Sequence, residues 1–131
     1  MTYLVRPTTI PLVALSINRR ESDHVTILDV RGRITLGDET DALRQSIRDL
    51  LAQGQKKILL NLAGVDYIDS SGVGELVSAF TTVRNAGGEL KLMNLTQKVH
   101  DVLNVTKLYT VFDIKDDEFR AVKSFDYFFA R

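Results

Sequence analysis

A short apolar run, Ile58 to Leu62, does most to limit the folds open to this chain. Runs of this kind form central strands that are covered on both faces. An amphipathic helical pattern follows the serine-rich turn after it and stops at Gly87-Gly88, where a second run, Glu89 to Met93, begins. A strand, a helix and a strand in succession imply parallel pairing through a right-handed crossover. The sequence therefore predicts an α/β fold.

Two further strands and a helix are expected before this unit. The strands, Leu12 to Ile17 and Val25 to Val30, flank a polar turn at residues 19–23, so they should form an antiparallel hairpin. Gly32 and Gly37 then frame a short loop. The helix that follows should begin with Asp38 as its N-cap and end at Gly54. Its apolar residues fall at helical spacing on one buried face: Leu43, Ile47, Leu50 and Leu51.

After Met93 the pattern predicts a short helix capped by Thr96, a last strand at 111–114 and a helix from Asp116 onward. The last helix should turn Phe119, Val122 and Phe125 inward. We expect one mixed β-sheet of four to five strands, with helices packed mainly on one face. We find no internal repeat or linker, so residues 1–131 should form a single domain. Its core would span about residues 12–122, with a short N-terminal extension and an aromatic C-terminal tail.

The composition excludes several classes of function. Lys plus Arg and Asp plus Glu both number 17, whereas nucleic-acid binders usually carry a basic excess. The chain has no cysteine and only two histidines, which argues against a metal site or a thiol nucleophile. No apolar run approaches the roughly 18 residues of a membrane helix, and Ile10 to Ile17, which contains Pro11, is more typical of an edge strand than of a secretory leader. We therefore expect a cytoplasmic protein without metal or cofactor.

The turn Asp69-Ser70-Ser71-Gly72-Val73-Gly74 is the main candidate for function. It should lie at the start of a helix, where unpaired N–H groups and the positive end of the helix dipole favour anions. In the simplest interpretation Ser70 or Ser71 caps the helix, and the glycines let its first turn approach the sheet. In another, one of these two serines is an exposed hydroxyl that a kinase phosphorylates.

This turn lacks the residues that the enzymatic interpretations require. A P-loop needs a lysine where Glu75 stands, and a dinucleotide-binding turn needs a third glycine where Val77 stands. The G-x-S-x-G elbow of serine hydrolases is absent, and His100, which could serve as a base, is expected on the surface. We therefore expect no enzyme. A phosphate on the turn would instead add charge to a surface made acidic by Asp66, Asp69 and Glu75, and would repel a docked partner.

The same turn, after Ile58 to Leu62, resembles the signature of the anti-sigma factor antagonists, which are free-standing STAS domains with a SpoIIAA-like fold. The likeness extends from about Leu12 to Val122. It includes Gly32-Arg33-Ile34, Gly87-Gly88-Glu89-Leu90 and the segment Val99 to Leu103.

The resemblance implies a partner-switching role. The unphosphorylated antagonist binds an anti-sigma factor that is also a serine kinase, and so frees a sigma factor. The kinase, which binds the ATP, then phosphorylates the serine that corresponds to Ser70, and a PP2C-type phosphatase reverses this. Asp69 would support local geometry and recognition by the kinase, and Gly72 would allow close approach of the partner. Ser71 and Gly74 belong to the same motif.

Two features depart from the family pattern. Many members carry Gly-Glu-Leu-Asp where this chain has Gly32-Arg33-Ile34-Thr35, in the loop that faces the kinase, where Thr35 could contact a partner. The tail Phe125 to Phe129 could cover the sheet and adjoining helices or form a partner or dimer surface. An alternative function keeps the fold without the switch: a STAS scaffold subunit of a larger signalling or transport assembly.

Overall fold

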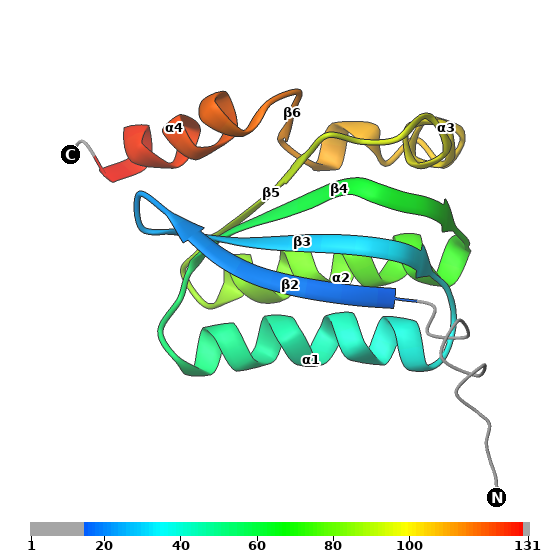
Figure 1. Ribbon diagram of the computed structural model, residues 1–131, viewed down its shortest axis with the longest axis horizontal. Helices are drawn as coiled ribbons and strands as arrows, with labels where there is room; N and C mark the ends of the chain where they lie inside the picture. The colour runs from blue at the N-terminus through cyan, green and yellow to red at the C-terminus, as the bar shows by residue number, and fades with distance from the viewer. Residues whose placement is uncertain (1–14, 130–131) are drawn as a thin grey trace, which may run out of the picture.

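The computed structural model describes residues 15–129, with side chains described as far as Phe125. Within this range the sheet has five strands in the order β2-β3-β4-β5-β6 (Figure 1). The strands are β2 (Leu15–Ser22), β3 (Val25–Ile34), β4 (Lys57–Ile68), β5 (Glu89–Met93) and β6 (Ile114–Lys115). The helices are α1 (Asp38–Ala52), α2 (Ser70–Asn85), α3 (Gln97–Val105) and α4 (Glu118–Phe129), and a short 3-10 helix, η2, spans Tyr109–Val111.

The pairing of the strands confirms a mixed sheet. β2 pairs antiparallel with β3, and the pairs β3–β4, β4–β5 and β5–β6 are all parallel. The expected turn at residues 19–23 is wrong, because β2 continues to Ser22 and the chain reverses at Asp23-His24. Both turn residues have positive φ, 50° and 68°, as a tight two-residue hairpin requires. Of the expected first strand, residues 12–14 lie outside the described residues.

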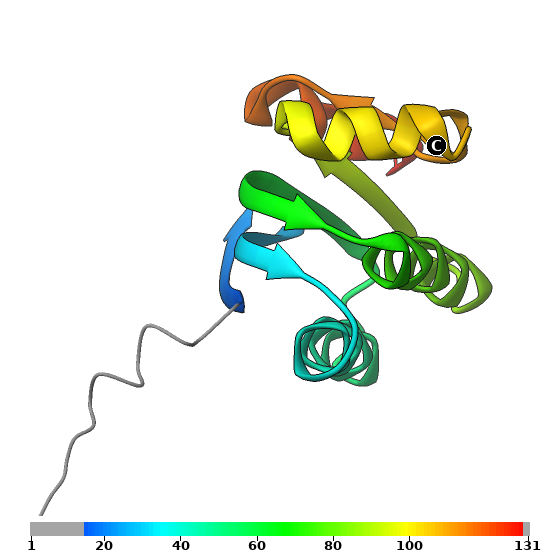
Figure 2. The same cartoon turned by 90° about the vertical axis from the view of Figure 1, so that its right-hand side faces the viewer.

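The helices cover both faces of the sheet rather than mainly one. Figures 1 and 2 show α1 and α2 on one side and α3 and α4 on the other. Alternate residues of the strands explain this division, since both faces are apolar. One buried cluster joins the sheet to α1 and α2 and includes Leu28, Val30, Leu60 and Leu92; it also contains Val99 and Leu103 of α3. A second cluster joins the sheet to α4 and contains Val25, Ile27, Leu59, Met93, Ala121, Val122 and Phe125.

Several element ends agree with the sequence and others do not. The end of α1 at Gly54 (φ 81°), the bounds of β5 and the Thr96 cap of α3 are confirmed. Asp38 is not the N-cap of α1, because Gly37 occupies that position and no side chain caps the helix. Gly32 lies within β3 and not at a loop, with φ 112° at a shift in the β3–β4 register.

The C-terminal part differs most from the expectation. Residues 109–111 form η2, so the last strand begins only at Ile114. In α4, Val122 and Phe125 are buried as expected, but Phe119 is 73% exposed. Phe119 therefore points away from the sheet, and its ring lies 5.8 Å from Lys123 Nζ.

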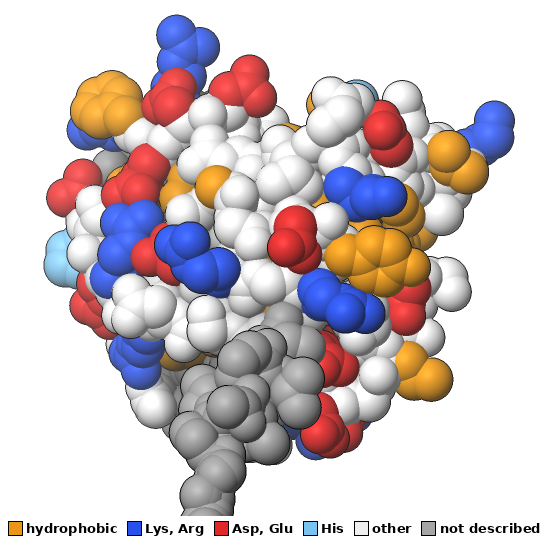
Figure 3. All heavy atoms as spheres, turned by 45° about the vertical axis from the view of Figure 1, so that its right-hand side comes forward, with side chains coloured by type: hydrophobic (Ala, Val, Ile, Leu, Met, Phe, Trp, Pro, Cys, Tyr) orange, Lys and Arg blue, Asp and Glu red, His pale blue; other side chains and the backbone are white. Residues whose placement is uncertain are grey.

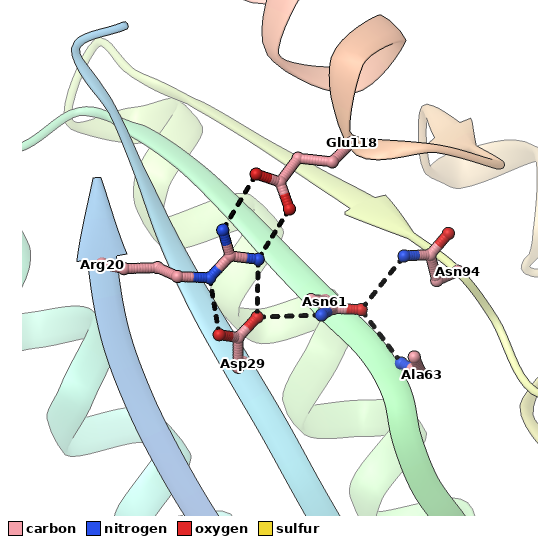
Figure 4. Close-up of polar contacts among 6 residues, drawn as sticks. All are labelled: Arg20, Asp29, Asn61, Ala63, Asn94 and Glu118. Carbon is pink, nitrogen blue, oxygen red and sulfur yellow. Dashed lines mark hydrogen bonds and ion pairs between the residues drawn. The ribbon is translucent and has the colours of Figure 1, made fainter. Parts of the chain in front are cut away.

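A polar network anchors the start of α4 to the sheet (Figure 4). The guanidinium of Arg20 donates to both oxygens of Asp29, at 2.6 and 3.1 Å, and to both oxygens of Glu118, at 2.9 and 2.6 Å. Asn61 also donates to Asp29, at 2.8 Å. The hydrogen bonds from Arg20 lower the pKa of both carboxyl groups, and the two carboxylates raise the pKa of Arg20.

Candidate functional site

The serine turn lies where β4 passes into α2. β3 and β4 stay paired to their last residues, with Ile34 opposite Ile68. The N–H of Asp69 then donates to the Ile34 carbonyl oxygen at 3.3 Å, so the chain is held against β3 as it leaves the sheet. α2 begins at the next residue, Ser70.

Asp69 is the N-cap of α2. Its backbone is extended, and its Oδ1 accepts a hydrogen bond from the N–H of Gly72 at 2.8 Å. Its Oδ2 accepts a bond from the N–H of Leu36 at 3.3 Å, which ties the β3–α1 loop to the turn. The interpretation in which Ser70 or Ser71 caps the helix is therefore wrong, because a carboxylate already fills that role.

Neither serine hydroxyl of the turn takes part in a hydrogen bond within the described residues. Ser70 is exposed at the first position of α2, and Ser71 is half-buried. The hydroxyl of Ser70 thus faces solvent at a helix end whose first N–H groups favour negative charge.

The two glycines of the turn have different surroundings. Gly72 is buried, and a Cβ there would overlap the Ile34 carbonyl oxygen and lie 2.7 Å from Ile68 Cγ1. The close approach that Gly72 permits is therefore to β3, inside the molecule. Apart from its chain neighbours and the backbone of its own helix, Gly74 has no described atom within 4 Å of the place where a Cβ would be, so packing does not require a glycine there.

The β3–α1 loop lies beside the turn. Thr35 is half-buried, and its hydroxyl donates to Glu39 Oε1 at 3.2 Å. The next residue, Leu36, is 75% exposed. Because Leu36 N–H is bonded to Asp69, the Thr35 loop and the Ser70 turn form one continuous surface.

The charges around the turn differ from the expected acidic surface. Glu75 is only 6% exposed, and its carboxylate pairs with Arg44 Nη2 at 2.8 Å. Both oxygens of Asp69 face backbone N–H groups. Asp66 alone of the three expected carboxylates is exposed and has no such bond among the described residues. The inclusion of Glu75 in an acidic docking surface was therefore wrong.

A cluster of cations around one tyrosine was not found from the sequence. Tyr67, near the end of β4, is 41% exposed, and the charged groups of Arg33 and Lys98 lie 5.5 and 5.6 Å from the centre of its ring. Arg33 comes from β3, where it pairs with Tyr67 in register, and Lys98 comes from the first turn of α3. Only the long-range packing of α3 on β4 brings Lys98 to this position, and no local pattern signals it.

His100, expected on the surface, is half-buried. Its ring packs edge-on against Tyr109 with 4.9 Å between ring centres, and its buried Nδ1 has no hydrogen-bond partner among the described residues. No hydrogen bond joins it to Ser70 or Ser71 in the described part of the chain. Over the same residues no group of three or more His, Cys, Asp or Glu side chains could hold a metal ion. Nor is any described helix long and apolar enough to cross a membrane.

Comparisons with known proteins agree with this fold. The STAS domain family model matches residues 16–121. The anti-sigma-B factor antagonist of Bacillus subtilis is 28% identical over 100 residues, which cover 76% of this chain and 90% of that protein. The crystal structure of a candidate anti-sigma factor antagonist from Thermotoga maritima has a TM-score of 0.74 at 25% identity, with 84% of this chain and 94% of that one covered. The Bacillus cell fate determinant SpoIIAA in its phosphorylated form has a TM-score of 0.63 at 19% identity, with 85% and 98% covered.

Proposed function

This chain belongs to the STAS domain family, and we propose that it is an anti-sigma factor antagonist whose partner binding is switched off by phosphorylation of Ser70. The observation that carries the proposal is the position of Ser70. Its hydroxyl is exposed at the first residue of α2, and Asp69 supplies the helix cap without it. The serine is thus free to be modified without loss of the cap.

The relatives support this assignment. Anti-sigma factor antagonists are among the similar curated proteins, and the SpoIIAA fold is known in both unphosphorylated and phosphorylated forms. We propose that the unphosphorylated chain binds an anti-sigma factor that is also a serine kinase and so releases a sigma factor. The kinase supplies the ATP, a PP2C-type phosphatase restores the binding form, and the exchange takes place in the cytoplasm.

In this scheme the chain contributes a substrate hydroxyl and no catalysis of its own. A phosphate on Ser70 carries about −1.5 to −2 charges at neutral pH. At the N-terminus of α2 this charge is stabilised by the helix dipole and by free N–H groups, so the fold should persist. The added charge then alters the outer surface, where Leu36, Thr35 and Ser71 would adjoin a docked partner.

The test is phosphorylation with purified anti-sigma factor kinases encoded in the source genome, together with ATP. Intact-mass spectrometry should show one added phosphate, and fragment spectra should place it on Ser70. Ser70→Ala should remain unmodified and bind the kinase constitutively, whereas Ser71→Ala is the matched control and should be modified normally. Modification of Ser71 instead, or of neither serine by any of these kinases, would contradict the proposal. A large complex that is indifferent to Ser70 substitution would instead indicate a scaffold subunit.

A further inference from the structure

We propose that Tyr67, Arg33 and Lys98, together with Leu36, form an anchor for a partner protein whose contact surface is apolar and bears carboxylates. We call these four residues the Tyr67 anchor. The inference rests on the proposed function only in taking Ser70 as the switch beside it. The anchor itself follows from exposure, geometry and charge.

The apolar part of the anchor is exposed to solvent next to the serine turn. Leu36 and Tyr67 are 75% and 41% exposed, and both are joined closely to the serine turn. Leu36 is bonded through its N–H to Asp69, and Tyr67 is the next-to-last residue of β4, three positions before Ser70. Figure 3 shows hydrophobic and basic side chains next to one another toward the right of this face. Aromatic residues and arginine are the types that most often dominate binding energy at protein interfaces.

The basic part of the anchor is held in place by the aromatic ring. Arg33 and Lys98 each lie within about 6 Å of the ring centre, the range of a cation–π interaction. The two side chains come from β3 and α3, so three elements of the fold fix the cluster. Such preorganisation reduces the entropy that binding would otherwise cost.

The two cations have no carboxylate partner in the part of the chain that the structure describes. Within the described residues no ion pair includes Arg33 or Lys98, although Asp66 adjoins Tyr67 in sequence. Other carboxylates at this end already accept hydrogen bonds: Asp69 from backbone N–H groups, Glu39 from Thr35 and Glu75 from Arg44. Carboxylates of a partner are the groups that would complement both cations while its apolar surface covers Tyr67 and Leu36.

The anchor also explains how a phosphate on Ser70 would act. The phosphate brings nearly two negative charges to a surface that presents two unpaired positive ones. A partner that approaches with carboxylates then meets repulsion and loses the attraction of Arg33 and Lys98. The switch works by cancelling a basic anchor, and it needs no change of fold.

The first experiment identifies the surface that meets the anchor. A photoreactive p-benzoylphenylalanine at Leu36 is expressed in the source cells, and the crosslinked peptide is sequenced by mass spectrometry. We expect a peptide from one protein in which Asp and Glu outnumber Lys and Arg. A crosslinked peptide dominated by Lys and Arg would overturn the proposal, and so would the absence of any crosslink.

The second experiment measures the affinity of the purified crosslinked protein for charge-reversed variants. Arg33→Glu and Lys98→Glu should each weaken binding about tenfold and flatten its dependence on salt, because each removes a contact between opposite charges. Arg48→Glu, at an exposed arginine of α1, is the matched control and should bind like the wild type. Equal affinities for all three variants would overturn the proposal.

A double-mutant cycle separates the anchor from the switch. Ser70→Asp should weaken binding strongly in the wild type but much less in the Arg33→Glu/Lys98→Glu background, because the attraction to be cancelled is already gone. If Ser70→Asp weakens binding equally in both backgrounds, the switch stands and the anchor fails. If the crosslinked partner is acidic but is no anti-sigma factor, the anchor stands and the proposed function fails.

Discussion

The carboxylate of Asp69 accepts a hydrogen bond from the backbone N–H of Gly72 at 2.8 Å, and this bond sets the first turn of α2. Because Asp69 caps the helix, the hydroxyl of Ser70 is not needed to cap the same helix end. The division of roles between neighbouring residues makes stability and switching separable. Variants at Asp69 should change mainly the fold, and variants at Ser70 mainly the binding.

Replacement of Asp69 by alanine should lower the free energy of unfolding by about 1 kcal/mol, the usual cost of losing a side-chain N-cap. Asp69→Ser keeps an oxygen that can accept the same bond and should retain most of this stability. Asp66→Ala, at an exposed residue outside the cap, should change stability by less than about 0.5 kcal/mol. Urea unfolding of the four proteins measures these differences, and an equal loss for Asp66→Ala and Asp69→Ala would contradict the cap assignment.

The two glycines of the turn provide a matched pair. Gly72→Ala should destabilise the fold by about 1–3 kcal/mol, because the new methyl group overlaps the Ile34 carbonyl and β3 cannot shift without disturbing its pairing in the sheet. Gly74→Ala should be neutral or stabilise the fold by up to about 1 kcal/mol, because alanine favours a helix interior and no atom obstructs its Cβ. Thermal unfolding compares both variants with the wild type. A Gly72→Ala protein as stable as Gly74→Ala would show that β3 does not require the glycine.

Much of the fold follows from local signals in the sequence. Gly87-Gly88 and Thr96 place the bounds of β5 and the start of α3, because turn and cap residues act on their immediate neighbours. The length of β4 could not be predicted, since its last residues continue the strand only because β3 pairs with them through two register shifts, with Tyr67 opposite Arg33 and Ile68 opposite Ile34. The direction of Phe119 likewise depends on how α4 docks, which the Arg20 network fixes from a distant strand.

In the candidate site, too, some features follow from local sequence signals and others from contacts between distant elements. Its position at the start of a helix was predictable from the serines and glycines that follow a strand. The use of Asp69 as cap, the burial of Glu75 against Arg44 and the position of Lys98 over Tyr67 depend on contacts between separate elements. Residue types alone could not distinguish an exposed carboxylate from a paired one.

The Arg20 network should make stability depend on pH in the acid range. Hydrogen bonds from Arg20 lower the pKa of Asp29 and Glu118 in the folded protein, so the unfolded chain binds more protons below about pH 4. The stabilisation is therefore complete above the ordinary carboxyl pKa and is lost as the pH falls toward the lowered values. Arg20→Met should unfold more easily at neutral pH and show a shallower loss of stability below about pH 4.

Urea unfolding at a series of pH values tests this prediction, with Arg48→Met as the control for loss of an exposed arginine. The control should follow the wild-type curve at each pH. If Arg20→Met shows the same pH dependence as the wild type, the network does not contribute to acid stability.

Ser70→Asp should leave the fold intact. A negative charge in the first turn of α2 is stabilised by the helix dipole by about 0.3–1 kcal/mol at low salt, so the free energy of unfolding should stay equal or rise slightly. Circular dichroism and urea unfolding check this. A loss of helix content or a large destabilisation would mean that any effect of Ser70→Asp on binding arises from misfolding.

The most direct test of the central claim compares two forms of the chain that differ only at the Ser70 hydroxyl. Phosphoserine is incorporated at position 70, and isothermal titration calorimetry measures the affinity of the modified and unmodified chains for the purified anti-sigma factor. The account predicts tight binding of the unmodified chain and a loss of about tenfold or more on phosphorylation, which corresponds to ~1.4 kcal/mol. Equal affinities of the two forms would contradict it.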